Sequence, residues 1–480
     1  MFEDVIDQGE RPFLVRWFVE AAPSLRSRWL WLRALGAIFF SAFYALWFQI
    51  HGLIGPAGIL PARDYLPYVK QALGAKGYWL VPSLLWFSTG RGMLTAIVAI
   101  GLAASLAIVF DLWPRLAIAV AGVCFLSFVS AAQVFSAYQS DGMLLEAAML
   151  SLFLAPRGLR PGLGRHDPPT RAAVFLLQWE WFRIYFESGL VKILSGEPQW
   201  RNLTAMDKYY ENGPLPTWLG WYVQQWPHWF HAGSAALTLL VELFLVWLLF
   251  VPSRRLRLLL FALATLLQAG IIITANYAFL NYLVLALGVL LLDDPAPVES
   301  TPRTRPPRIQ LIALPLAFAL SIILFLAPVS PPAQLVEPFR VINNYGLFAV
   351  MTRARYEIEF QGTRDGRTWI AYPFHYKAQD PKRAPGIFAP YQPRFDWNLW
   401  FASLGSVSSD PWVMSVQQRL LENAPDVLHL FAGNPFANEP PRAVRAVLWQ
   451  YWFTTPAERA RTGAWWNRRL LGEYAPAVSR

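Results

Sequence analysis

The stretch Gln178–Trp200, QWEWFRIYFESGLVKILSGEPQW, has the length and apolar content of a membrane-spanning helix. It nevertheless contains four ionisable side chains, Glu180, Arg183, Glu187 and Lys192. A charge at the centre of a bilayer costs roughly 2.5–3.5 kcal/mol on insertion scales, so these side chains are not expected to face lipid. The sequence therefore predicts that other parts of the chain surround this helix.

The overall composition is that of a polytopic membrane protein. Of the 480 residues, 55% are hydrophobic and 15% are charged, whereas a soluble chain carries about 25% charged residues. Apolar runs close to the ~20 residues needed to cross a bilayer recur along most of the sequence. The net charge of +10 comes from arginines in short loops between these runs. That distribution favours control of topology and contact with anionic lipid over nucleic-acid binding.

We predict an all-α bundle of about nine transmembrane helices and a C-terminal α+β domain. A basic amphipathic segment covers 1–29, the transmembrane domain covers 30–329 with an outer loop at 195–231, and a soluble domain covers 330–480. The expected spans are about 30–49, 93–110, 116–135, 142–155, 172–194, 232–251, 256–274, 277–292 and 309–327. The arginines place the N-terminus in the cytoplasm and the C-terminal domain on the exoplasmic side.

The soluble domain is expected to place its strands mainly before its helices. Predicted strands are 346–352, 355–361, 369–377 and 442–455, because these runs are rich in aromatic and β-branched residues. Asp410 followed by Pro411 predicts the start of a helix that continues to about Asn423.

The charged span divides into two helical faces. Glu180, Arg183 and Glu187 share one face, so Arg183 can pair with a carboxylate one turn away on either side. This face is either a structural clasp or a polar site open to the outer side. Tyr185, Ser188 and Lys192 share a second face. Lys192 either acts as a base after losing water contact or extends to the outer membrane interface.

Other polar residues are expected to complete a polar interior. Asp141 and Glu146 flank the start of the fourth span, where they either meet Arg183 or Lys192 or interact with the helix dipole. Glu242 in the sixth span, with Gln268 and Asn276, is a further candidate. His228 and His231 have a spacing that suits a metal on a helix, but no third ligand is near. We therefore predict no metal site and no cofactor, and instead an aromatic belt at the interface.

Several longer segments resemble the lipase maturation factor family. They are SAYQSDGMLLEAAMLSLFLAP (136–156), WFRIYFESGLVKILSGEPQWRNLTAMDKYYENGPLPTWLGWY (181–222), VINNYGLFAVMT (341–352), QPRFDWNLWFASL (392–404), NPFANEPPRAVRAVLWQYWFT (434–454) and GAWWNRRLLGEY (463–474). The resemblance implies a multipass membrane protein that helps exported lipases fold and assemble. Family members in animals reside in the endoplasmic reticulum, whereas this chain is expected in a bacterial inner membrane.

A more distant likeness points to chemistry. YFESGLVKIL (185–194) followed by Trp200 is similar to a membrane motif of vitamin K-dependent gamma-carboxylase, and that comparison matches Lys192 to a catalytic base. Two hypotheses follow. The first is a maturation factor that binds exported clients and membrane lipids, with partner contacts at Trp200, Trp218, Trp221, Trp226 and Trp229. The second is a membrane-embedded enzyme that acts on a lipid or quinol-like substrate through Lys192 and Tyr185.

Overall fold

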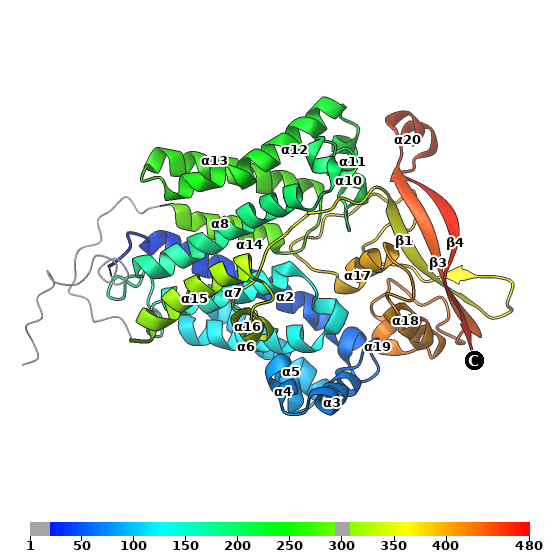
Figure 1. Ribbon diagram of the computed structural model, residues 1–480. Coiled ribbons are helices and arrows are strands. Elements are labelled where there is room, and N and C mark those ends of the chain that lie inside the picture. The colour runs from blue at the N-terminus through cyan, green and yellow to red at the C-terminus, as the bar shows by residue number, and fades with distance from the viewer. Residues whose placement is uncertain (1–19, 293–307) are drawn as a thin grey trace, which may run out of the picture.

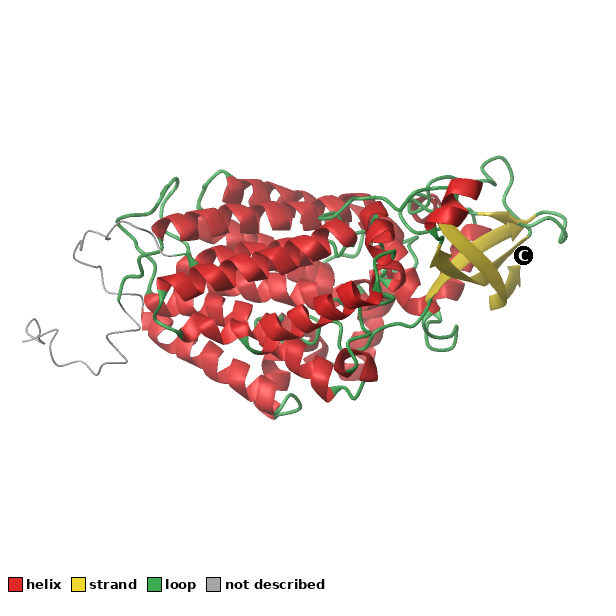
Figure 2. Ribbon diagram, turned by 90° about the horizontal axis from the view of Figure 1, so that it is seen from above, coloured by secondary structure: helices red, strands yellow, loops and turns green. Residues whose placement is uncertain are grey.

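The protein consists of a helical bundle with a smaller, sheet-containing part at one end (Figure 1). The computed structural model describes residues 20–292 and 308–480. Figure 2 shows the long helices side by side, with all the strands gathered beyond one end of the bundle. Most of the predicted 1–29 segment, and the linker at 293–307, lie outside the described residues.

Each of the nine predicted spans falls on a helix. These helices are α2 Leu25–Ile54, α5 Arg91–Val109, α6 Pro114–Ala131, α7 Gln139–Leu154, α8 Arg171–Leu194, α12 His228–Leu243, α13 Arg254–Thr274, α14 Leu280–Gly288 and α15 Arg308–Leu326. Short helices occupy the connections: α3 Ala62–Leu73, α4 Lys76–Leu80, α9 Pro198–Arg201, α10 Tyr209–Asn212, α11 Trp218–Gln224 and α16 Pro331–Val336.

Six helices in the described part of the chain are long and apolar enough to cross a membrane. They are α2, α5, α6, α13, α15 and the continuous stretch His228–Phe250 that includes α12. The other three expected spans are exceptions for physical reasons: α7 and α14 are short, and α8 carries the four charges. The chain is a multi-pass membrane protein, and the count of nine spans remains a proposal.

The C-terminal part contains one four-stranded antiparallel sheet with the strand order β2-β1-β3-β4. The strands are β1 Arg355–Thr363, β2 Ile370–Ala371, β3 Ala443–Phe453 and β4 Trp466–Ser479. Helices α17 Arg394–Ser403, α18 Trp412–Leu421 and α19 Pro425–Leu428 lie between β2 and β3, and α20 Pro456–Thr462 precedes β4. Ile358 and Phe360 of β1 are fully buried, and Glu357 and Glu359 between them are buried as well, so this strand is covered on both faces.

Several predictions for this domain are confirmed and others are wrong. The strands at 355–361 and 442–455 and the helix after Pro411 are confirmed. The predicted strand at 346–352 is a loop, because its backbone groups bond to side chains of the bundle rather than to a neighbouring strand. Of the strand predicted at 369–377, only Ile370–Ala371 pairs. The expected order of strands before helices is also wrong, since β3 and β4 end the chain.

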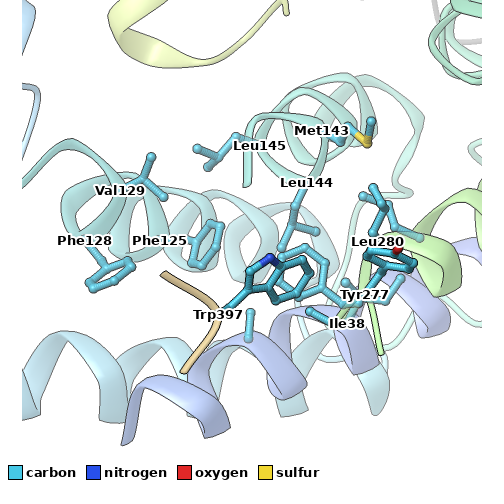
Figure 3. Close-up of a cluster of buried hydrophobic side chains, with 14 of the residues drawn as sticks. Ile38, Phe125, Phe128, Val129, Met143, Leu144, Leu145, Tyr277, Leu280 and Trp397 are labelled. Atoms are coloured by element: carbon cyan, nitrogen blue, oxygen red, sulfur yellow. The ribbon is translucent and has the colours of Figure 1, made fainter. Parts of the chain in front are cut away.

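The two parts share a hydrophobic core where α17 meets the bundle. Figure 3 shows the indole of Trp397 lying among side chains of α2, α6, α7 and the start of α14. Its ring centroid lies 5.3 Å from that of Tyr138 and 6.0 Å from that of Tyr277. Because Trp397 is almost fully buried in this position, the C-terminal part is packed onto the bundle rather than tethered beside it.

Candidate functional site

Helix α8 carries its ionisable side chains into the protein interior, as the sequence predicted. The helix begins at Thr170, whose side chain accepts a hydrogen bond of 3.1 Å from the backbone N–H of Ala173. Glu180, Arg183 and Lys192 are each at most 2% exposed. The carboxylate oxygens of Glu180 make no hydrogen bond to any described residue. The charges of α8 are therefore shielded from lipid by protein.

Arg183 has its main partner on a neighbouring helix. Its Nη2 atom donates to Glu146 Oε1 of α7 at 2.6 Å, whereas its Nε atom is 3.9 Å from Glu187 Oε1 on α8. The predicted clasp within α8 is therefore mainly a bridge from α8 to α7. The contact between Glu146 and Arg183 was one of the two arrangements that the sequence left open.

The loop at 341–352 closes over this cluster. The backbone N–H of Asn343 and the hydroxyl of Tyr345 both donate to Glu146 Oε2, at 2.9 and 2.7 Å. The backbone N–H of Tyr345 donates to Glu187 Oε2 at 2.8 Å. The guanidinium of Arg183 also lies 5.2 Å from the centre of the Tyr345 ring. The buried charges are thus matched by groups from a segment more than 150 residues away in sequence.

Gly142 makes room for this loop. A Cβ atom at position 142 would lie 2.5 Å from Asn343 Oδ1, which is closer than such atoms can approach. The Asn343 side chain instead donates to the Gly142 carbonyl at 3.0 Å. A residue with a side chain at this turn of α7 would therefore displace the Asn343 side chain from its present position.

Lys192 forms a second buried ion pair. Its Nζ atom lies 2.9 and 2.8 Å from the two carboxylate oxygens of Glu242 on α12 and donates to the Leu347 carbonyl at 2.9 Å. The approach of the two helices depends on Gly189, where a Cβ atom would lie 2.8 Å from Glu242 Cβ. Because an ammonium has three N–H donors, these contacts satisfy a protonated lysine. Neither of the two alternatives from the sequence, a base or an interfacial lysine, included this partner.

Tyr185 belongs to a chain of three polar side chains. Asn281 Nδ2 donates to Gln268 Oε1 at 2.6 Å, and Gln268 Nε2 donates to the Tyr185 hydroxyl at 2.8 Å. Gln268 was among the expected polar residues, but Asn281 was not. The predicted Asn276 lies elsewhere, where its side chain donates to the Gly386 carbonyl at 2.9 Å.

A cavity of about 400 Å³ adjoins both Lys192 and Tyr185. Its walls come from α8, α12, α13, the start of α14 and the loop at 341–352, and most of the lining is apolar. The other polar side chains of the lining are Ser188, Tyr209, Tyr210, Ser234, Thr238, Glu242, Gln268, Thr274 and Asn281. The structure therefore places Lys192 and Tyr185 beside one cavity, as their shared helical face predicts.

Asp141 has a partner in the C-terminal part. Its carboxylate accepts hydrogen bonds from Arg394 Nη1 at 2.7 Å and from Arg394 Nη2 at 2.8 Å. The pair is almost fully buried, and it joins the start of α7 to the start of α17. The sequence left open whether Asp141 meets Arg183 or Lys192 or lies at the positive end of a helix dipole; the first alternative is wrong, whereas Asp141 does lie in the first turn of α7. The partner has no local signal, because 253 residues separate the two.

A second ion pair joins the same two parts at the surface. Arg91, the first residue of α5, contacts the carboxylate of Asp426 in α19. The hydrogen bond from the Arg91 guanidinium holds the pKa of the Asp426 carboxyl below its usual range.

The two histidines point to different partners. His228 Nδ1 lies 2.9 Å from Asp207 Oδ1, and His231 Nε2 lies 2.9 Å from the Trp226 carbonyl. Within residues 20–292 and 308–480, no group of three or more potential ligands is arranged to hold a metal ion.

Comparisons with known proteins identify the family. A family model described as "Lipase maturation factor transmembrane domain" matches residues 26–298, and one described as "Lipase maturation factor C-terminal domain" matches residues 341–476. The chain belongs to the lipase maturation factor family. The resemblance noted in the sequence is therefore confirmed.

The relatives align with nearly the whole chain. Lipase maturation factor 2 of Gallus gallus is 32% identical over 95% of this chain and 82% of its own length. Lipase maturation factor 1 of Bos taurus is 32% identical over 94% of this chain and 88% of its own length. Lipase maturation factor 1 of Homo sapiens is 30% identical over 93% of this chain and 87% of its own length. No solved structure matches.

In this lipase maturation factor, the matched C-terminal domain supplies partners for charges of the matched transmembrane domain. Asn343, Tyr345 and Arg394 lie within residues 341–476, whereas Glu146 and Asp141 lie within residues 26–298. Asn343, Tyr345 and Arg394 all lie in segments that resemble the family, but the sequence alone predicted no role for them. Pairing of buried charges across domains is not visible in local periodicity, so only the tertiary structure reveals it.

The tryptophans predicted to contact partners divide into two groups. Trp200 and Trp221 are buried, and their indole N–H groups donate to the Phe348 carbonyl at 2.9 Å and to Thr454 Oγ1 at 3.3 Å. These two side chains hold the maturation factor together and do not reach its surface. The side chains of Trp218, Trp226 and Trp229 are exposed and available to a partner.

Proposed function

We propose that this chain assists the folding and assembly of exported lipases by binding them at the end of the bundle that carries the sheet. Support comes from the family models for both domains and from relatives named lipase maturation factor along most of their length. The proposal adds a surface to that family role and places the surface on the exoplasmic side.

An exposed aromatic surface on residues 218–231 carries this proposal. It consists of Trp218, Tyr222, Trp226 and Trp229, and Trp229 is 74% exposed. Tryptophan, tyrosine and arginine dominate the energetically important positions of protein interfaces. A surface of this kind beside a folded domain suits a client that exposes apolar segments before it is fully folded.

The aromatic surface is continuous with the C-terminal domain. The guanidinium of Arg459 in α20 lies 3.5 Å from the centre of the Trp465 ring and donates to the Tyr222 hydroxyl at 3.0 Å. A shallow hollow of about 660 Å³ lies between these residues, with Trp226 at its edge. A client bound here would touch both matched domains, and the relative position of those domains is fixed by the buried ion pairs.

The enzyme hypothesis has less support. A catalytic base needs an unprotonated amine with a free lone pair, whereas Lys192 Nζ contacts both oxygens of Glu242 and the Leu347 carbonyl. This geometry suits an ammonium ion with a structural role. The maturation hypothesis requires no chemistry from Lys192.

Client binding can be tested on the aromatic surface. The variant Trp218→Ser/Trp226→Ser/Trp229→Ser is compared with Trp113→Ser, which removes an exposed tryptophan directly before α6, whereas the other end of α6 leads to the contact with α17. Each chain is co-expressed with an exported lipase, cross-linked in cells and purified through a tag on the lipase. We expect the triple variant to lose at least about tenfold in recovered complex, since a single hot-spot residue is worth about 2 kcal/mol or more. Equal recovery of all three chains, at equal expression, would rule out this surface.

A further inference from the structure

The cavity beside α8 opens toward the side of the bundle. Its lining includes Leu266 and Ile273 of α13 and Trp226 before α12, all of which are exposed. Only 17% of the most apolar stretch of α13 is buried inside the protein, so its remaining surface faces the hydrocarbon of the membrane. The cavity therefore communicates with lipid between α12 and α13, the two helices that lie together at one side of the bundle (Figure 1).

The volume of the cavity suits a small amphipathic molecule. Ligand sites usually enclose about 300–1,000 Å³ and combine an apolar wall with a few polar groups, and this cavity of about 400 Å³ lies in that range. Its lining on α8 runs from Ile184 to Lys192, and the eight helical steps between them make about 12 Å along the helix axis. Along α12 the lining runs from Phe230 to Glu242, which is about 18 Å.

The Tyr185 hydroxyl in the cavity has an unused donor, and the Tyr209 hydroxyl, which also lines the cavity, has no hydrogen-bond partner among the described residues. The Tyr185 hydroxyl accepts a hydrogen bond from Gln268, whose own oxygen is held by Asn281. The hydrogen of that hydroxyl has no acceptor among the described residues, although Tyr185 is only 2% exposed. A buried donor without an acceptor is destabilising. The chain of Asn281, Gln268 and Tyr185 thus leaves the O–H group of Tyr185 available to donate to an acceptor inside the cavity.

The charges of the cavity restrict the ligand. Lys192 and Glu242 neutralise each other through contacts of 2.8 and 2.9 Å, so the cavity presents no unpaired charge to a ligand. A ligand with a net charge would bury that charge without a counter-ion, which is strongly unfavourable at membrane depth. An uncharged head with a carbonyl acceptor avoids this cost and satisfies Tyr185.

We propose that this cavity binds a neutral acylglycerol that enters from the membrane between α12 and α13. Its acyl chain lies on the apolar wall, and its ester carbonyl accepts the hydrogen bond of Tyr185. Trp226 belongs both to this site and to the client surface, but lipid binding in the cavity does not depend on the proposed function. No covalent step is involved.

The probe is a monoacylglycerol with a photoactivatable diazirine in its acyl chain. The full chain is reconstituted in phosphatidylcholine vesicles, exposed to the probe and ultraviolet light, and digested for mass spectrometry. Gly270 lines the cavity and has open space where a Cβ atom would be, so Gly270→Leu fills the cavity. Gly233 also has open space around its Cβ position but does not line the cavity, which makes Gly233→Leu a matched control.

We expect label on the peptides of α12 and α13 in the unmodified chain and in Gly233→Leu, and loss of that label in Gly270→Leu. Tyr185→Phe keeps the ring and removes the donor, so labelling at a subsaturating probe concentration should fall roughly 2- to 12-fold. Unchanged labelling in Gly270→Leu would overturn the site. If Gly270→Leu does not fold, Ser234→Leu fills the same cavity from α12.

A second set of probes tests whether the ligand is a neutral ester. A diazirine hydrocarbon without an ester should label the same peptides more weakly than the monoacylglycerol, and Tyr185→Phe should not change that weaker labelling. A lysophospholipid with a charged head should compete poorly with the monoacylglycerol. Equal labelling by the ester and the hydrocarbon, or effective competition by the charged lipid, would contradict a neutral ester ligand.

Discussion

Asp141 and Arg394 form a buried, two-pronged ion pair that joins the transmembrane and C-terminal domains. The hydrogen bonds measure 2.7 and 2.8 Å, and Arg394 also donates to the Phe135 carbonyl at 2.7 Å. A bidentate arginine–carboxylate contact fixes orientation as well as distance. Together with Trp397 beside it, this pair explains how the C-terminal domain keeps one position on the bundle.

Removing one partner of this pair should loosen the domain. Asp141→Asn leaves the Arg394 charge buried without a counter-ion, and breaking such a pair costs about 3–5 kcal/mol. We expect limited proteolysis to cut the C-terminal domain faster in Asp141→Asn than in the unmodified protein. Asp64→Asn, which changes an exposed carboxylate, is the control and should behave as the unmodified chain. Identical digestion of both variants would mean that the pair does not hold the domains together.

Arg183 should be more important for stability than an exposed arginine. Arg183→Leu leaves Glu146 and Glu187 without their cationic partner in the interior. We expect a loss of about 3–5 kcal/mol in the free energy of unfolding, measured by denaturant titration in detergent. Arg63→Leu, at an exposed site, should change it by less than about 1 kcal/mol. A similar stability for the two variants would contradict the burial of Arg183.

The second ion pair separates a structural role of Lys192 from a catalytic one. Lys192→Met alone leaves Glu242 buried and unpaired, so we expect a lower melting temperature. Lys192→Met/Glu242→Leu removes both charges and should recover most of that stability, because apolar replacement of a complete buried pair is often neutral. A folded double variant that still supports lipase maturation is the expected result. A folded double variant without maturation activity would favour the enzyme hypothesis.

Asp396 gives the C-terminal domain a pH dependence. Burial raises the pKa of its carboxyl from 3.8 to about 7, against the opposing effect of Lys377. The folded protein therefore binds this proton more tightly than the unfolded chain does. The contribution of Asp396 to stability is complete below about pH 4 and is lost as the pH rises through 7.

This contribution is measured by comparison with Asp396→Asn, which cannot ionise. Melting temperatures are recorded in detergent from pH 5 to pH 8 for both proteins. We expect the unmodified chain to lose stability relative to Asp396→Asn as the pH rises, by at most about 1.4 kcal/mol per pH unit. Parallel melting curves across this range would mean that Asp396 titrates normally.

The sequence was sufficient to predict the helices of the bundle and the burial of the α8 charges. Helical spacing placed Tyr185 and Lys192 on one face, and both line the same cavity. The insertion cost of a charge was enough to predict that α8 is enclosed. These predictions succeeded because they depend on local periodicity and on transfer energies.

The partners of these charges were less accessible to sequence reasoning. Glu146 and Glu242 were recognised as polar interior residues, but their partners depend on two close approaches, that of the 341–352 loop at Gly142 and that of α12 at Gly189. The segment 346–352 has the composition of a strand, yet it bonds to the bundle, which overrides β propensity. Strand β4 was missed because most of its side chains are exposed and Pro476 lies within it. An edge strand of this kind lacks the usual alternation.

The central claim is that the chain raises the fraction of exported lipase molecules that become active. The direct measurement is the activity of secreted lipase per molecule, with molecules counted by antibody, in cells that lack the chain and in cells that express it. We expect a several-fold higher specific activity when the chain is present, and no such rise with Trp218→Ser/Trp226→Ser/Trp229→Ser. Equal specific activity with and without the chain would contradict it.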